Sequence, residues 1–112
     1  MNLINTYHKL NTGAPSVLGR KLFYAPVKPV QCKDGFRMSV QAGEYLYSSP
    51  REAAAWPYTA FEVGFPSEAE PLLMEYAEDP DRPTDTVYGY VPANVIEAVI
   101  AKHGGLKTID GE

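Results

Sequence analysis

Glycine and proline punctuate the whole chain and limit how long any helix can be. The sequence holds nine glycines and ten prolines among its 112 residues, which is above their usual combined share of about 12%. Proline stops a helix and both residues favour turns. The pattern therefore predicts few or short helices and excludes a helical bundle, while the length and the 45% hydrophobic content suit one folded domain.

The last third of the chain has the clearest periodicity. Residues 86–91 are rich in β-branched and aromatic side chains, which predicts a strand. Pro92 suits the first turn of a helix, and one apolar stripe follows it, made of Val95, Ile96, Val99 and Ile100. We therefore expect a helix over residues 93–103 that packs on a sheet, with His103 favourable at its end and Gly104 as the left-handed cap.

Further strands are expected earlier in the chain. Residues 36–41 alternate apolar and polar side chains, residues 44–47 suggest the strand returning from them, and residues 58–65 suggest a third. Residues 21–25 suggest an edge strand or an extended segment, residues 51–57 a helical turn or a loop, and residues 71–78 a short helix. The prediction is an α+β domain over residues 21–112, with a small antiparallel sheet of four to five strands and the C-terminal helix on one face, after an N-terminal arm over residues 1–20.

Charge is strongly segregated along the chain. Residues 1–51 carry seven basic residues against two acidic ones, whereas residues 52–85 carry nine acidic residues against Arg82 alone. We call residues 52–85 the acidic block. Such a run indicates either a solvated face kept for solubility or a negative surface that docks on a basic groove. For the second interpretation, the expected contacts are Trp56, Glu62, Glu68, Glu70, Glu75, Tyr76, Glu78, Asp79, Asp81 and Asp85.

Catalytic and metal-binding motifs are missing from the sequence. It has no phosphate-binding loop, no dinucleotide-binding glycines, no nucleophile elbow and no zinc-protease motif. The Asp79, Asp81 and Asp85 loop lacks the EF-hand pattern, and the single Cys32 permits no internal disulfide. We expect no cofactor, no metal and no enzyme; an enzyme would need a pocket where carboxylates converge with His8 or His103.

Targeting signals are also missing, since no signal peptide and no apolar run of membrane-spanning length occurs. We therefore expect a cytoplasmic chain without membrane contact. Aromatic residues near lysine and arginine occur only in the first half of the chain. Net acidity then argues against direct binding of nucleic acid.

Four segments resemble small accessory proteins of bacteriophages and mobile elements: residues 34–42, 63–68, 87–92 and 102–105. Among these proteins, anti-CRISPR inhibitors are similar in size, acidity and lack of catalytic motifs. The resemblance implies a monomeric or homodimeric inhibitor that binds a host protein with a basic nucleic-acid-binding groove, such as a CRISPR effector complex, partly by imitating the charge of DNA. The alternative is a small virion structural or assembly protein that self-associates through complementary charged faces.

Overall fold

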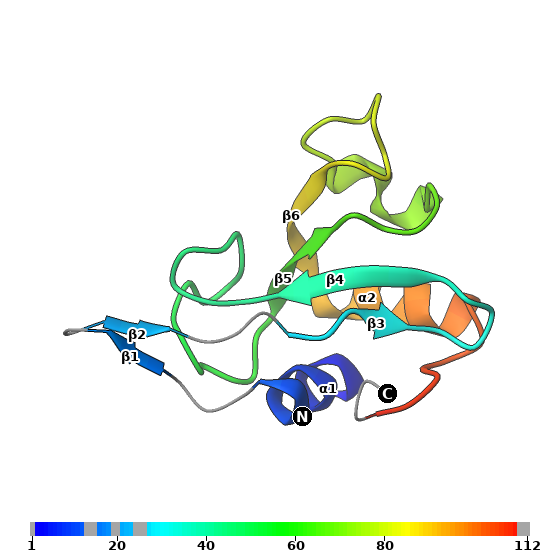
Figure 1. Cartoon of the computed structure of the whole chain (residues 1–112). Coiled ribbons are helices and arrows are strands. Elements are labelled where there is room, and N and C mark those ends of the chain that lie inside the picture. Colours follow the sequence, from blue (N-terminus) through cyan, green and yellow to red (C-terminus); the bar gives the residue numbers. More distant parts are fainter. Residues whose placement is uncertain (1, 13–15, 19–20, 24–26, 110–112) are drawn as a thin grey trace.

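The computed structural model is built around a four-stranded antiparallel sheet (Figure 1) and describes residues 2–12, 16–18, 21–23 and 27–109. The strand order is β3 (Val30–Gln31), β4 (Arg37–Gln41), β5 (Ala60–Gly64) and β6 (Val87–Pro92). Ser39 pairs with Gly64, and Gly64 pairs with Val87. The α+β class and the antiparallel sheet are therefore confirmed.

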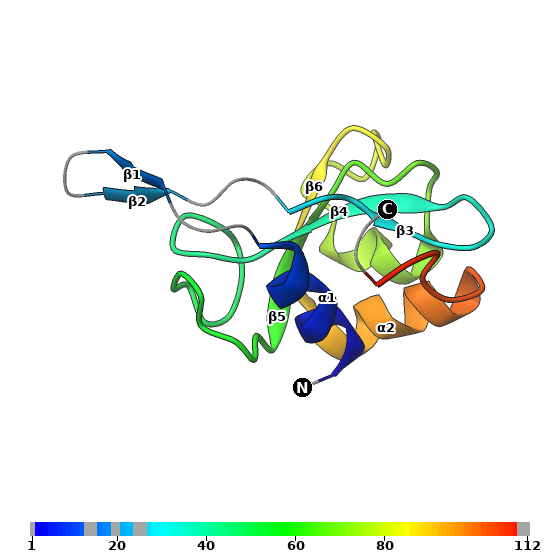
Figure 2. The ribbon, with the colours of Figure 1, turned by 60° about the horizontal axis from the view of Figure 1, so that its bottom comes forward.

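Two helices pack on one face of this sheet. Figure 2 shows α1 (Leu3–Asn11) and α2 (Ala93–Lys102) side by side. The backbone N–H of Ile4 donates to Glu97 Oε1 at 2.9 Å, which ties α1 to α2. The predicted C-terminal helix is confirmed, and Gly104 after it has the left-handed φ of 90°.

The hydrophobic core lies between the sheet and the two helices. Alternation along β4, β5 and β6 turns one side chain in two toward the helices. The apolar stripe of α2 meets these side chains. Buried members from these elements and α1 are Ile4, Tyr7, Met38, Val40, Phe61, Val63, Tyr88, Val91, Ile96, Val99 and Ile100.

The N-terminal segment differs from the arm that we expected over residues 1–20. Residues 3–11 form α1, in which Ile4 and Tyr7 are fully buried. The Asn5 side chain donates to the Tyr58 carbonyl at 2.9 Å and accepts from the Tyr58 N–H at 2.6 Å. This helix belongs to the core because a distant loop completes its contacts, and a short polar sequence does not reveal that. Next, β1 (Ser16–Leu18) and β2 (Lys21–Phe23) form a separate antiparallel hairpin (Figures 1 and 2). Residues 24 and 25 of the expected edge strand lie outside the described residues.

The strand expected over residues 44–47 is wrong. Those residues form a turn, and β4 pairs with β5 instead. Within the turn, the Gly43 N–H donates to Ser48 Oγ at 3.2 Å. Tyr45 and Tyr47 alternate as they would in a strand, but Tyr45 is exposed and no partner strand covers it. Residues 51–57 form a loop, and the short helix is the 3₁₀ helix η1 (Pro71–Tyr76).

Candidate functional site

Much of the acidic block forms a projection beside β6, which we call the acidic lobe (residues 71–86). It consists of η1 and the following loop, and it rises above the sheet in Figure 1. The Glu78 N–H donates to the Val87 carbonyl at 2.9 Å, and the Asp79 N–H donates to Thr86 Oγ1 at 3.0 Å. Inside the lobe, the Tyr88 hydroxyl donates to the Pro83 carbonyl and Leu73 is fully buried. These contacts hold the lobe in one arrangement.

Most carboxylates of the lobe face solvent. Glu75, Glu78, Asp81 and Asp85 are exposed and Asp79 is half-buried, while Glu68 is exposed just before the lobe. Arg82 is the only basic residue in residues 71–86, all of which the structure describes, and it pairs with Asp85. Five of the acidic residues predicted as contacts therefore belong to the lobe, and Glu68 lies in the chain just before it.

Glu70 is the exception, because its side chain is buried. It is 1% exposed, and its Oε2 accepts from the Leu72 N–H at 2.7 Å, which caps η1. Its Oε1 accepts from His103 Nε2 at 2.9 Å and lies 2.9 Å from Lys102 Nζ. On its other side, His103 Nδ1 lies 2.6 Å from Asp34 Oδ2. Glu70, expected as a partner contact, is therefore buried and belongs to a His103 cluster (Asp34, Glu70, Lys102 and His103).

The charge state of His103 follows from this geometry. Both ring nitrogens face carboxylate oxygens, so the protonated ring donates to Asp34 and to Glu70. Burial opposes the charged ring, but the two hydrogen bonds outweigh burial and raise the pKa of His103. Burial by itself would raise the pKa of Glu70. The hydrogen bonds that Glu70 accepts from Lys102, from the Leu72 N–H and from His103 lower that pKa below its ordinary value. The ring also stacks on Phe36, with centroids 4.1 Å apart.

The His103 cluster joins three segments that are far apart in the sequence. Asp34 comes from the turn before β4, Glu70 begins η1, and His103 ends α2. The cluster anchors the base of the acidic lobe to the body of the domain. Sequence reasoning explained His103 by its favourable position at the end of a helix and did not find this cluster, because the bonded partners are 69 and 33 residues away.

The other three expected contact residues, Trp56, Tyr76 and Glu62, are half-buried and contact other parts of the protein. Trp56 is half-buried and its indole N–H donates to His8 Nδ1 at 2.9 Å, so it is less of a surface anchor than expected. Tyr76 is half-buried against the core. Glu62 is half-buried and accepts from the Tyr47 N–H at 3.3 Å. Burial lowers the pKa of His8 to about 4, so its ring is neutral.

A second surface feature, which we call the aromatic strip, lies on the sheet face turned away from the helices. It consists of Phe65, Tyr90 and Tyr47, which are 58%, 45% and 43% exposed. Alternation along the strand expected over residues 58–65 puts Phe65 on the same face as Phe61 and Val63. A left-handed backbone at Phe65, with φ of 49°, directs its ring to solvent instead. Only the backbone path after β5 reveals this.

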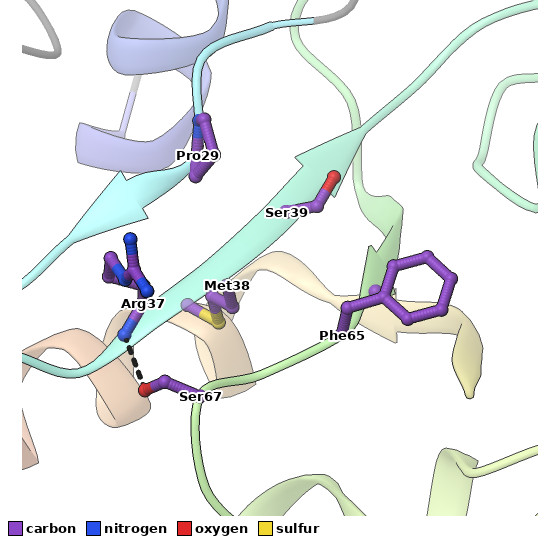
Figure 3. A pocket seen from close by; sticks show the side chains of 7 residues that line it. Pro29, Arg37, Met38, Ser39, Phe65 and Ser67 are labelled. Atoms are coloured by element: carbon purple, nitrogen blue, oxygen red, sulfur yellow. Dashed lines mark hydrogen bonds between the residues drawn. The ribbon is translucent and has the colours of Figure 1, made fainter. Parts of the chain in front are cut away.

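An open cavity of about 260 Å³ adjoins the strip, shown in Figure 3. It is lined by Pro29, Arg37, Met38, Ser39, Gly64, Phe65 and Ser67. The Arg37 N–H donates to Ser67 Oγ at 3.0 Å at one end of it. Neither a carboxylate nor a histidine lines this cavity, so it does not provide the convergence that the enzyme alternative requires.

The described part of the chain holds no group of three or more His, Cys, Asp or Glu side chains that could bind a metal ion. No described helix is long and apolar enough to cross a membrane. Comparisons of the chain with family models, with curated protein sequences and with solved structures found no match.

Proposed function

We propose that the chain is a non-enzymatic phage or mobile-element protein that inhibits a bacterial defence complex of the CRISPR type. In this proposal, the acidic lobe enters a basic nucleic-acid-binding groove of a host protein in the cytoplasm and takes the place of nucleic acid. The observation that carries the proposal is the gathering of exposed Glu75, Glu78, Asp81 and Asp85 on one projection in which Arg82 is the only cation.

Electrostatics and order together support this role. Carboxylates held close together repel one another, and a partner of opposite charge compensates that cost. The backbone bonds of Glu78 and Asp79 and the His103 cluster hold the lobe before any partner arrives. A pre-ordered surface loses less conformational entropy on binding than a flexible acidic loop.

The structure changes which residues we assign to the contact. Exposed Glu68, Glu75, Glu78 and Asp81 would meet the groove directly. Asp79 and Asp85 would lie at the rim, since Asp79 is half-buried and Asp85 pairs with Arg82. Glu62, Trp56 and Tyr76 are half-buried and secondary, and Glu70 supports the lobe from behind.

The test is a plating assay in bacteria that carry active CRISPR systems of different types. Cells expressing the chain are challenged with a targeted phage, and the efficiency of plating is measured. We expect the wild type to raise plating for at least one system, and Glu75→Gln/Asp81→Asn to reduce that effect at least about tenfold, because lost charge complementarity weakens the complex.

A matched control removes the same charge elsewhere. Glu44 and Glu52 are exposed and lie outside the lobe, so Glu44→Gln/Glu52→Gln should plate like the wild type. The proposal fails if no system is inhibited, or if the lobe variant and the control behave alike. Self-association that rises with concentration, measured by sedimentation and lost in the lobe variant, would instead favour the assembly alternative.

A further inference from the structure

Phe65 and Tyr90 combine two unfavourable features. Each keeps a large aromatic ring in water, and each has a left-handed backbone, with φ of 49° and 52°. Bulky L-residues rarely adopt this conformation, because Cβ approaches the following carbonyl oxygen. Strained backbones of this kind gather at binding sites, where the surrounding structure maintains them. The conformations point to a ligand for the exposed rings.

A glycine precedes each of the two residues. Gly64 precedes Phe65 and Gly89 precedes Tyr90, and the Tyr47 side chain packs over Gly89, since a Cβ added there would lie 3.4 Å from Tyr47 Cβ. The Phe65 N–H donates to the Thr86 carbonyl, and Tyr90 follows Thr86 by four residues. At about 3.3 Å per residue, the backbone positions of the two residues are at most about 13 Å apart along β6, because the register shift between β5 and β6 and the left-handed Tyr90 shorten the strand. This length matches up to about four residues of an extended segment.

Two carboxylates, Glu78 and Glu62, border the strip. Ala77 pairs with the buried Tyr88, so alternation places the neighbouring Glu78 on the same outer face as the strip. Glu62 of β5 also lies on this face, and its Oε1 accepts from the Tyr47 N–H. The acidic lobe continues beyond Glu78. A cation that reaches the strip from the side of the lobe therefore meets aromatic faces and negative charge together.

Two cations of the described residues lie near the strip. Arg37 stands at the start of β4 and lines the same cavity as Phe65, on the side of β5 away from β6. The Arg51 guanidinium carbon lies 5.6 Å from the centre of the Tyr47 ring. This internal pair shows that a guanidinium fits on one ring of the strip, while the Phe65 and Tyr90 rings have no such partner among the described residues.

We infer that the aromatic strip binds an extended, arginine-bearing segment of the partner protein, with guanidinium groups on Phe65 and Tyr90 and with Glu78 opposing their charge. The inference rests on the proposed function, because a basic groove that receives the lobe would present its arginines to the adjoining strip. Arginine fits better than lysine, because its planar, weakly hydrated head stacks on a ring and an ammonium remains hydrated.

The experiment compares two labelled 12-residue peptides by fluorescence anisotropy: one alternates arginine and serine, the other lysine and serine. Wild type should bind the arginine peptide about fivefold more tightly, as stacking on two rings allows. Phe65→Asn/Tyr90→Asn should bring the ratio of the two affinities, arginine peptide over lysine peptide, close to one. Asparagine tolerates the left-handed backbone, so the variant should keep or raise the thermal midpoint, which separates lost binding from lost folding.

Two further variants separate this inference from the proposed function. Leu10→Gln removes an exposed apolar side chain from α1 on the opposite side of the sheet and should leave the ratio unchanged. Glu75→Gln/Asp81→Asn should weaken both peptides equally and also leave the ratio unchanged. Equal binding of both peptides to wild type would overturn the inference, and the plating result would still decide the proposed function. Binding of an oligothymidine strand that depends on Phe65 and Tyr90 would also overturn it.

Discussion

Replacing Glu70 by alanine tests whether the His103 cluster anchors the acidic lobe. The substitution removes the side-chain cap of η1, worth about 1 kcal/mol. It also removes the carboxylate that faces the buried His103 ring, and a hydrogen bond to a charged group contributes about 1.5–3 kcal/mol. The variant also loses the ion pair between Glu70 and Lys102. Because the Lys102 side chain is half-exposed and water can solvate its ammonium group, the loss of this ion pair adds little to the cost. The expected cost is about 3 kcal/mol.

Thermal denaturation followed by circular dichroism measures this cost. For a domain of this length, about 3 kcal/mol lowers the thermal midpoint by about 12 °C. Glu68→Ala is the matched control, because Glu68 is an exposed glutamate two residues away and should change stability by less than about 0.5 kcal/mol.

Equal midpoints for the two alanine variants would refute the reasoning, because they would show that the buried contacts of Glu70 contribute nothing net. If Glu70→Ala does not fold, Glu70→Gln takes its place. Glutamine keeps one carbonyl oxygen for the Leu72 N–H but turns an amide donor toward His103 or Lys102. Its expected cost is about 1–2 kcal/mol, since one of the charged bonds is lost.

Three other outcomes follow from the structure. The pKa of His103 is raised in the folded protein. Its contribution to the free energy of unfolding is therefore full below the ordinary histidine pKa of about 6.5 and is lost as the pH rises through the pKa of the folded state. In urea unfolding, the difference in free energy of unfolding between wild type and His103→Asn should shrink on the alkaline side. The pKa of His8 is lowered to about 4, so the gap between wild type and His8→Gln should shrink as the pH falls from about 6.5 toward 4. Burial and then Asp34 raise the pKa of Cys32 to about 11, so a thiol reagent should label it slowly until urea unfolds the chain; fast native labelling would contradict its burial.

Local pattern predicted those elements whose residues are close in sequence. To predict the C-terminal helix, it was enough to see the helical periodicity of its apolar stripe from Val95 to Ile100. To predict β5 and β6, it was enough to see alternating or β-branched residues. The same reasoning failed at residues 44–47 and at α1. In both places the outcome depends on pairing with residues far along the chain: β5 takes the position expected for the returning strand, and Tyr58 completes the contacts of Asn5.

The sequence alone determined the excess of acidic residues in residues 52–85, the absence of known catalytic motifs and the C-terminal helix, because these depend on composition or on neighbours within a few turns. Tertiary structure alone decided which of those residues face solvent. Glu70 and Glu75 are the same residue type five positions apart, yet one is buried against His103 and the other is exposed. Long-range packing sets the environment of each side chain, and the environment decides whether a carboxylate supports the fold or is free to meet a partner.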